Sequence, residues 1–420
     1  MKKDTIALHH GYDPKECEGT MSVPIYQTTA YAFKDAKYAA DLFDLKIDGS
    51  IYTRLNNPTT DIFEKRFAAY EGGAAAIATS SGMAAIFNSI INVAEAGDNI
   101  IISDKLYGGT VTLATHTLKR FGIEARIFDA DEAKNLEDLI DDKSKCIIFE
   151  SLSNPQIAIP DVEKIVSIAK KHKILTICDN TVASAALFNP IKWGVDVVVH
   201  STSKYTTGQG TALGGIIVES EDTVNLLKNN DRYYHFNEPD VSYHGVVFSE
   251  LNNPFTTRVR LCVIRDIGSA PSPFNSWLLL QGLETLDIRM QKHSKNALDV
   301  AKFLESHPKV KRVSYPGLES NKYHERAQKY LKNGQSSGLL SFEAESFDEA
   351  KKIMNSVKIF SIVVNIGDSK SIITHPASTT HQQLSFEELE SAGISPSLIR
   401  LSIGLEDSED LIKDLKEAMK

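Results

Sequence analysis

Small and hydroxylated residues follow two apolar runs of the sequence, where they could hold a phosphate group. Ser81, Gly82 and Met83 follow one run and begin a segment of helical character. The first backbone N–H groups of a helix have no partners within it, and together with the helix dipole they favour an anion. Ser201 and Ser203 follow another run and could add two hydroxyl groups to the same anion.

A lysine, an aspartate and a tyrosine stand at similar positions and extend this chemistry. Lys204 directly follows Ser203, and a lysine shielded from water can lose its proton and form a Schiff base. Asp179 could pair with a protonated ring nitrogen, an interaction worth about 4 kcal/mol at 4 Å and an effective dielectric constant of 20. Tyr107 could stack on the face of that ring. A phosphate, an aldehyde, a pyridinium and an aromatic face are the features of pyridoxal 5′-phosphate (PLP), which we therefore expect as the cofactor.

Each of these residues also has an ordinary structural interpretation. A lysine after a strand is usually a solvated loop residue, Asp179 could cap a helix through the sequence Asp-Asn-Thr, and Tyr107 could be a packing aromatic. The serines before Gly82 could form a simple helix cap. The joint arrangement at the ends of successive apolar runs favours PLP over these interpretations.

Apolar runs alternate with helix-like segments over the middle of the chain. Such alternation indicates βαβ units and a mostly parallel sheet. Because ligands bind beyond the carboxyl ends of the strands in such a sheet, we expect the residues named above to lie at one edge. The predicted strands are 74–79, 99–103, 125–128, 146–150, 174–179, 196–200 and 215–219, and the predicted helices are 84–94, 110–121, 131–140 and 162–171.

The predicted elements divide the chain into an arm and two domains. Residues 1–60 lack strong periodicity, so we expect an arm that contributes to a neighbouring subunit. We expect residues 61–285 to form the PLP-binding α/β domain, in which the less regular residues 222–275 are predicted to be a long functional loop region. A long helix over 273–307 leads into a smaller C-terminal α+β domain at 286–420. The strands predicted there are 311–315, 339–343, 360–364 and 399–402.

The composition indicates a globular protein of a reducing environment. The 420 residues include 46 Lys and Arg and 55 Asp and Glu, and this net charge of −9 argues against a nucleic-acid partner. No apolar stretch approaches the roughly 20 residues of a membrane span, and the first residues carry no secretory signal. The four cysteines are scattered, as in reduced cytosolic proteins, so we expect a cytoplasmic location. The histidines form no convincing set of metal ligands, so we predict no metal.

Motifs along nearly the whole chain resemble those of the Cys/Met-metabolism PLP enzymes. They are YTRLNNPT (52–59), ATSSGMAAI (78–86), LYGGT (106–110), ESLSNP (150–155), DNT (179–181), HSTSK (200–204), HPASTTH (375–381) and RLSIGLE (400–406). The resemblance implies the aspartate-aminotransferase-like fold, or fold type I, of PLP-dependent transferases. Within that family the sequence most resembles the O-acetylhomoserine sulfhydrylases, or homocysteine synthases, through GQGTALGG (208–215), YHGVVF (243–248) and SPFNSWLLLQGLETL (272–286).

The resemblance implies a role for each matching residue. Lys204 would be the Schiff-base lysine, Asp179 the partner of the pyridine nitrogen, and Tyr107 the residue that stacks on the ring. Arg400 would bind the substrate carboxylate, with Ser371 nearby. The other cofactor contacts would come from Gly82, Met83, Ser201 and Ser203 at the phosphate, from Asn154 (also near the substrate) and Glu150 at the ring, and from Tyr52 and Arg54 of the neighbouring subunit. Two residues depart from the family pattern: Ser203 stands where many relatives have Thr, and Gln209 where they often have His.

The resemblance further implies a γ-replacement reaction that converts O-acetyl-L-homoserine and sulfide to L-homocysteine and acetate. With methanethiol in place of sulfide, the product would be L-methionine. Lys204 would move the Cα and Cβ protons, and Tyr107 or the neighbouring Tyr52 could assist the leaving group. A homotetramer built from dimers with shared sites is expected. The alternatives are a methionine γ-lyase, a cystathionine γ-synthase or an O-succinylhomoserine sulfhydrylase. A non-catalytic α/β binding protein is a further alternative, against which the Lys204–Asp179 pair argues.

Overall fold

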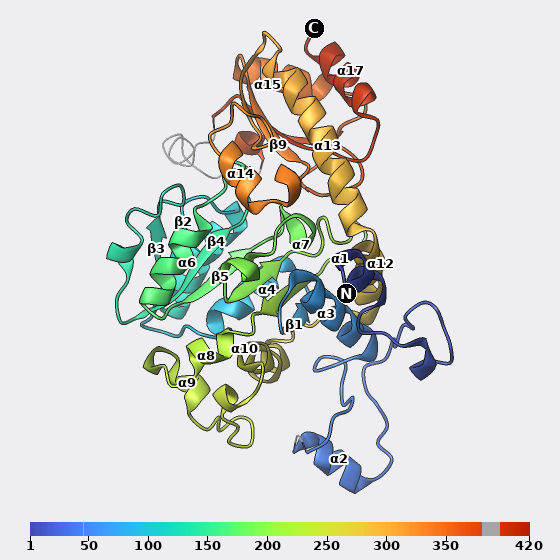
Figure 1. Ribbon diagram of the computed structural model, residues 1–420, viewed down its shortest axis with the longest axis vertical. Helices are drawn as coiled ribbons and strands as arrows, with labels where there is room; N and C mark the ends of the chain where they lie inside the picture. Colours follow the sequence, from blue (N-terminus) through green and yellow to red (C-terminus); the bar gives the residue numbers. More distant parts are fainter. Residues whose placement is uncertain (45, 380–394) are drawn as a thin grey trace.

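The computed structural model describes residues 1–44, 46–379 and 395–420, which form two lobes, each built around one β-sheet (Figure 1). The large sheet has the strand order β1-β7-β6-β5-β4-β2-β3, and only β7 runs antiparallel to its neighbours. This topology confirms the predicted α/β class with a mostly parallel sheet. The strands are β1 (Ala75–Thr79), β2 (Asn99–Ser103), β3 (Glu124–Phe128), β4 (Ser144–Glu150), β5 (Leu175–Asp179), β6 (Val197–His200) and β7 (Gly215–Glu219).

Helices cover both faces of the large sheet, which explains why its strands are apolar on both sides. No helix in the described ranges has both the length and the apolar character needed to cross a membrane. The helices of this lobe are α1 (Lys3–His9), α2 (Ala36–Phe43), α3 (Pro58–Glu71), α4 (Gly82–Ile91), α5 (Gly108–Thr112), α6 (Val162–Lys171), α7 (Ser184–Leu187), α8 (Thr223–Leu227), α9 (Tyr234–Asn237), α10 (Pro254–Arg258), α11 (Arg265–Ile267) and α12 (Pro273–Glu284).

The C-terminal lobe contains a smaller, mixed sheet with the strand order β10-β11-β12-β9-β8. Only β10 and β11 pair in parallel. In Figure 1, α13 runs from the large-sheet lobe into this lobe and joins the two. Its elements are α13 (Leu286–Glu305), β8 (Val310–Ser314), α14 (His324–Tyr330), β9 (Leu339–Ala344), α15 (Phe347–Ser356), β10 (Ser361–Ile362), β11 (Ile372–Thr374), β12 (Leu398–Ser402) and α17 (Ser408–Ala418).

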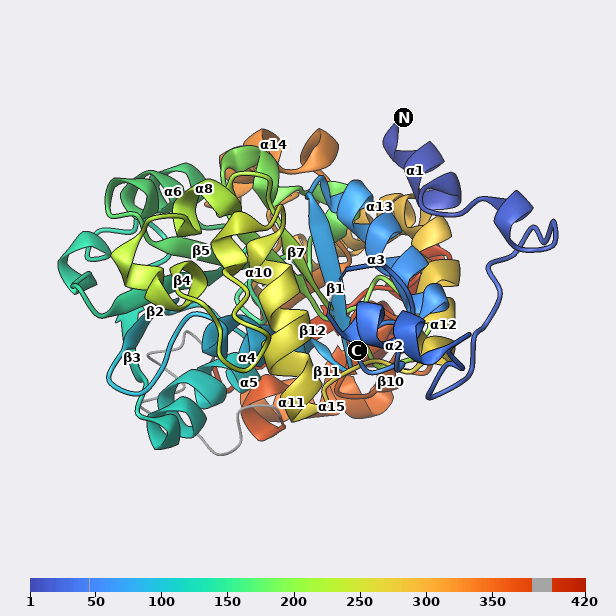
Figure 2. The ribbon, with the colours of Figure 1, turned by 90° about the horizontal axis from the view of Figure 1, so that it is seen from below.

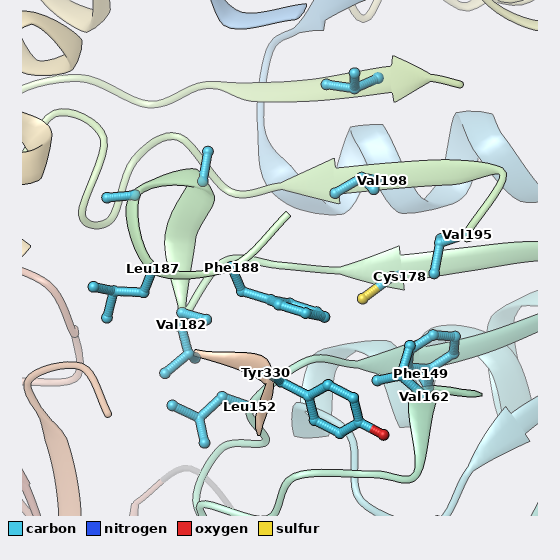
Figure 3. Close-up of a cluster of buried hydrophobic side chains, with 14 of the residues drawn as sticks. Phe149, Leu152, Val162, Cys178, Val182, Leu187, Phe188, Val195, Val198 and Tyr330 are labelled. Atoms are coloured by element: carbon cyan, nitrogen blue, oxygen red, sulfur yellow. The ribbon is translucent and has the colours of Figure 1, made fainter. Parts of the chain in front are cut away.

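The core on one face of the large sheet includes residues of both lobes. Figure 3 shows side chains of adjacent strands, among them Phe149, Cys178 and Val198, in one cluster with Phe188 and Tyr330. Tyr330 belongs to α14 and packs against Phe188 with the ring centroids 6.1 Å apart. Because this apolar contact joins the lobes, it helps to fix the position of the C-terminal lobe over the strand ends.

Several sequence predictions differ from the structure, three of them in the extent of helices and loops. The predicted helix 131–140 contains only a short 3₁₀ turn, Glu137–Leu139. The predicted loop region 222–275 instead contains short helices, because aromatic residues such as Phe236 and Phe255 are buried in the core. The predicted helix 273–307 is two helices, α12 and α13, which meet at Thr285.

The helix α1 packs against α3 and α12, whereas most of the chain between α1 and α3 extends away from the two lobes. Figure 1 shows α2 at the end of a long extension below the large sheet, and in Figure 2 the chain between α1 and α2 passes outside α3 and α12. Large apolar side chains are exposed on this segment, among them Met21 and Phe43. Such exposure agrees with an arm that another chain covers. The division into an arm at 1–60 and domains at 61–285 and 286–420 stays a prediction.

Glu219, the last residue of β7, gives the fold a testable pH dependence. Burial raises the pKa of Glu219 from 4.5 to about 7. The folded protein therefore holds this proton more tightly than the unfolded chain, and the free energy of unfolding falls as the pH rises from 4.5 through 7. In Glu219→Gln we expect this decrease to be smaller, by up to about 3 kcal/mol, because the amide does not ionise. Thermal unfolding of both proteins at acid and alkaline pH measures the difference, and equal slopes would contradict the assignment.

Candidate active site

A cavity of about 230 Å³ opens at the carboxyl ends of β4, β5 and β6, beneath residues of the C-terminal lobe. It brings together most of the residues predicted for the site, at the predicted edge of the sheet. These residues are Gly82, Met83, Tyr107, Glu150, Asn154, Asp179, Ser201, Ser203, Lys204 and Arg400.

The N-terminus of α4 forms one end of the cavity. Ser81 caps this helix, since its side chain accepts a hydrogen bond of 3.1 Å from the N–H of Ala84. A Cβ atom at Gly82 would lie 2.4 Å from the Cβ of Ser201, so only glycine permits this close approach. The backbone N–H groups at the start of the helix and the Ser201 hydroxyl are thereby placed together as an anion site.

The hydroxyl group of Ser203 already has partners in the backbone. Its Oγ accepts a hydrogen bond of 2.9 Å from the N–H of Gly214 and lies 3.1 Å from the Gly214 carbonyl oxygen, to which it donates. To donate to a phosphate, Ser203 must rotate its proton away from this carbonyl. The hydrogen bond from the N–H of Gly214 still holds the Ser203 oxygen in place, so only the hydroxyl proton has to turn from the carbonyl toward the phosphate.

Asp179 presents one free carboxylate oxygen to the cavity. Its Oδ1 accepts hydrogen bonds from the N–H and the hydroxyl group of Thr181, at 2.9 and 2.5 Å. Among the described residues nothing donates to Oδ2. Burial raises the pKa of Asp179, whereas the two Thr181 hydrogen bonds and the charge of His200 oppose the rise. A protonated ring nitrogen beside Oδ2 would provide the missing partner.

Lys204 extends across the cavity to a residue of the other lobe. Its Nζ donates a hydrogen bond of 2.6 Å to the Oδ1 of Asn365. Burial lowers the pKa of Lys204, and the positive charge of Arg400 lowers it further. Both effects favour the neutral amine, which is the form that attacks an aldehyde and accepts a proton.

Among the described residues, no carboxylate pairs with the buried guanidinium of Arg400 on β12. Its Nη1 donates to the Oδ1 of Asn154 at 3.0 Å, and its Nη2 donates to the carbonyl oxygen of Asn365 at 3.1 Å. Within the described part of the chain, its buried Nε has no hydrogen-bond partner. Burial lowers the pKa of Arg400 to about 10. A substrate carboxylate would neutralise this charge, so the arrangement fits an amino acid or another carboxylate ligand.

Three residues predicted for the site lie outside the cavity. Tyr52 and Arg54 are exposed on the arm, with the Arg54 guanidinium 5.2 Å from the centroid of the Tyr52 ring, and neither lines the cavity of the same chain. Ser371 is fully buried outside the cavity, where its Oγ donates to Glu406 at 2.8 Å and accepts from the N–H of Gly404 at 2.8 Å. The substrate-binding role predicted for Ser371 has no support from this geometry.

Sequence reasoning missed Asn365, which contacts both cationic residues of the cavity. The residue follows the predicted strand 360–364, so the strand-end argument used for the large sheet could have identified it. That strand is short, since β10 covers only Ser361–Ile362. No local pattern in the C-terminal lobe indicates which edge of its sheet meets the large sheet.

The residues of the cavity fit PLP. The free Oδ2 of Asp179 suits the ring nitrogen, and the uncovered N–H groups of α4 beside Ser201 suit the phosphate. Lys204 is held within the same cavity by Asn365, and the Tyr107 ring lines its wall. Among the described residues, no group of three or more metal-ligating side chains occurs.

The chain is similar to known proteins over its whole length. The model of a family described as Cys/Met metabolism PLP-dependent enzyme matches residues 4–420. The O-acetyl-L-homoserine sulfhydrylase of Leptospira meyeri is 44% identical over 100% of this chain and 97% of that protein. The homocysteine synthase of Schizosaccharomyces pombe is 44% identical over 99% of this chain and 97% of its own length.

A solved structure supports the same relationship. The crystal structure of a putative O-acetylhomoserine (thiol)-lyase from Campylobacter jejuni superimposes with a TM-score of 0.98, at 56% identity and 100% coverage of both chains. That crystal structure contains N′-pyridoxyl-lysine-5′-monophosphate at its position 205.

Proposed function

Because the chain belongs to the Cys/Met metabolism PLP-dependent enzyme family, we propose that it exchanges the acetate group of O-acetyl-L-homoserine for sulfide. The Cγ–O bond breaks, a Cγ–S bond forms, and the products are L-homocysteine and acetate. With methanethiol in place of sulfide, the product is L-methionine. The observation that carries this function is 44% identity over 97% of a relative named for the reaction.

PLP is the cofactor of this enzyme. When bound, PLP withdraws electrons from the substrate Cα and makes its proton acidic. In the proposed arrangement Lys204 holds the aldehyde, Asp179 keeps a proton on the ring nitrogen and Tyr107 covers the ring face. The remaining contacts are assigned to Gly82, Met83, Ser201 and Ser203 at the phosphate, and to Asn154 and Glu150 beside the ring.

Lys204 is proposed to move the substrate protons. Once the substrate amine has replaced Lys204 at the aldehyde, the freed neutral amine can remove the proton from Cα, and later a proton from Cβ, which allows acetate to leave from Cγ. Asn365 accepts a hydrogen bond from its Nζ and so orients the amine within the cavity. Tyr107, or Tyr52 of a neighbouring copy, is assigned to assist the departing acetate.

Arg400 is proposed to bind the substrate carboxylate. Asn154 and the carbonyl of Asn365 fix the plane of the guanidinium through Nη1 and Nη2. The buried Nε is then free to donate to the incoming carboxylate. Binding by a fixed planar donor orients the Cα of the substrate as well as holding it.

We assign Tyr52 and Arg54 to the cofactor phosphate of a neighbouring copy, within a homotetramer built from dimers. Both residues are exposed on the arm. Among the described residues that line the cavity, the only cations are Lys204 and Arg400, which the proposal places at the aldehyde and the carboxylate. An arginine from outside would supply the charge that the phosphate needs.

Product analysis tests the proposed function. PLP-loaded protein is given O-acetyl-L-homoserine with and without sulfide, and homocysteine, 2-oxobutyrate and ammonia are measured. We expect homocysteine only with sulfide and little 2-oxobutyrate. Abundant 2-oxobutyrate and ammonia regardless of sulfide would identify a lyase and overturn the proposal. A parallel reaction with O-succinyl-L-homoserine distinguishes the ester, which we expect to react more slowly than the acetyl substrate.

A further inference from the structure

We propose that Glu150 is a positioning residue that connects the turn of the ring-stacking tyrosine to the arginine that binds the substrate carboxylate. The inference deepens the proposed function, on which it rests for the roles of Tyr107 and Arg400. It predicts that loss of the Glu150 carboxylate weakens the binding of both the cofactor and the amino acid.

The geometry around Glu150 is that of a bridge between two chain segments. Glu150 ends β4 and is buried, with an exposed fraction of 6%. Its Oε1 accepts a hydrogen bond of 2.6 Å from the N–H of Tyr107, and its Oε2 accepts one of 3.1 Å from the N–H of Asn154. One carboxylate therefore fixes the backbone at both segments.

Each end of this bridge controls a different part of the cavity. Tyr107 immediately precedes α5, so its N–H anchors the turn that carries the ring. Asn154, at the other end, accepts a hydrogen bond from the Nη1 of Arg400 through its side chain. The resulting connection runs from Tyr107 through Glu150 and Asn154 to Arg400.

Because Asp179 is adjacent to Glu150, the positioning role of Glu150 can be distinguished from an effect of its charge. Glu150 and Asp179 are register partners on adjacent strands. Burial, followed by the charge of Asp179, raises the pKa of Glu150. A neutral glutamine at position 150 removes any repulsion between the two side chains and therefore favours ionised Asp179. An electrostatic role alone thus predicts that the substitution leaves cofactor binding unchanged or tightens it, whereas the bridge predicts weaker binding.

The test compares Glu150→Gln with a matched control elsewhere in the sheet. The control is Glu219→Gln, because Glu219 is also a buried strand-end carboxylate that accepts hydrogen bonds from two backbone N–H groups, those of Phe255 and Thr256. Glu219 does not line the cavity. For each protein we measure the melting temperature, the Kd for PLP on the cofactor-free form, and the Kd for glycine from its effect on the visible absorption of the holoenzyme.

We expect both variants to lose stability, but only Glu150→Gln to raise the two dissociation constants, each by roughly tenfold or more. Unchanged dissociation constants in Glu150→Gln would overturn the proposal. A rise in the Kd for PLP alone would also overturn it, because it would show that Glu150 does not affect binding at Arg400. If Glu150→Gln does not fold, Glu150→Asp is measured instead, because a shorter carboxylate cannot span both N–H groups and is expected to shift both constants in the same direction.

A double substitution tests the path through the side chain of Asn154. In an Asn154→Ala background the contact with Arg400 is absent, so Glu150→Gln is expected to have little further effect on the Kd for glycine. A full additive effect would contradict this path. Glycine has no Cγ, so these measurements do not depend on the exchange reaction. Failure of the wild-type protein to convert O-acetyl-L-homoserine would therefore refute the proposed function without deciding the role of Glu150.

Discussion

Replacement of Lys204 by alanine is expected to reduce turnover of O-acetyl-L-homoserine by roughly 10⁴-fold or more. The loss has two physical causes. The variant lacks the amine that holds the cofactor aldehyde, and it lacks the base that moves the Cα and Cβ protons. Steady-state measurement of homocysteine formation at saturating PLP gives the size of the effect. Substantial retained activity would remove Lys204 from the mechanism.

A buried lysine outside the cavity, Lys145, provides the control for this substitution. Lys145 lies in β4, donates a hydrogen bond of 2.6 Å to the carbonyl oxygen of Arg232, and is absent from the cavity lining. We expect Lys145→Met to lower the melting temperature while leaving the PLP absorption and kcat close to those of the wild type. Partial recovery of Lys204→Ala by added methylamine would further show that the missing group is the amine.

Replacement of Asp179 by asparagine is expected to reduce kcat by about 10³-fold. Its carboxylate is half-buried at the end of β5, and a pair of opposite charges at 4 Å is worth about 4 kcal/mol at an effective dielectric constant of 20. Without this charge the ring nitrogen loses its proton, and PLP withdraws electrons from Cα less strongly. We also expect a weaker affinity for PLP and a shifted visible absorption, measured by titration of the cofactor-free protein.

Asp196 offers a close structural match for this test. Like Asp179, it accepts hydrogen bonds from the N–H and the hydroxyl group of one threonine, Thr176, at 2.8 and 2.6 Å, although Asp196 is more deeply buried than Asp179. Because Asp196 stands at the opposite end of the strands, Asp196→Asn is expected to reduce stability without changing the affinity for PLP. Equal effects of the two substitutions on PLP binding would show that Asp179 acts through the fold alone.

The electrostatic balance of the cavity connects these two predictions. Lys204 and Arg400 repel one another, and burial lowers the pKa of both residues. The phosphate of PLP and the carboxylate of the substrate each add negative charge near these two cations. Because the positive charge of Arg400 lowers the pKa of Lys204, removing Arg400 would raise that pKa. A defect in substrate binding and a change in the pH profile of proton transfer are expected to occur together in Arg400 variants.

Much of the site could be predicted from the sequence because its residues follow strands of one parallel sheet. Apolar runs determine strands through local properties of the chain, and the predicted strands 146–150 and 174–179 occur as β4 and β5 with small shifts in their bounds. The carboxyl ends of parallel strands meet at one edge, which brings Asp179 and Lys204 together without further information. Residue type then indicates the chemistry, because a lysine, an acid and a helix N-terminus suit the parts of PLP.

Local pattern failed where burial depends on distant partners. The segment 222–275 contains many turn-forming residues, yet Phe236 and Phe255 pack in the core and order short helices around them. The helical pattern of 131–140 produced only a 3₁₀ turn. The strand β11 spans only Ile372–Thr374, too short a run for its pattern to be distinguished from a loop.

The sequence by itself thus determined the sheet, the cofactor and the residues at the strand ends, because all of these depend on local pattern and residue type. Only the tertiary structure decided how the C-terminal lobe completes the site. It placed Asn365 against Lys204 from 161 positions away, brought Arg400 to Asn154, and directed Ser371 to Glu406 instead of the cavity. These placements follow from the packing of α14 and its neighbours on the large sheet, a contact between distant segments that leaves no periodic signal in either one.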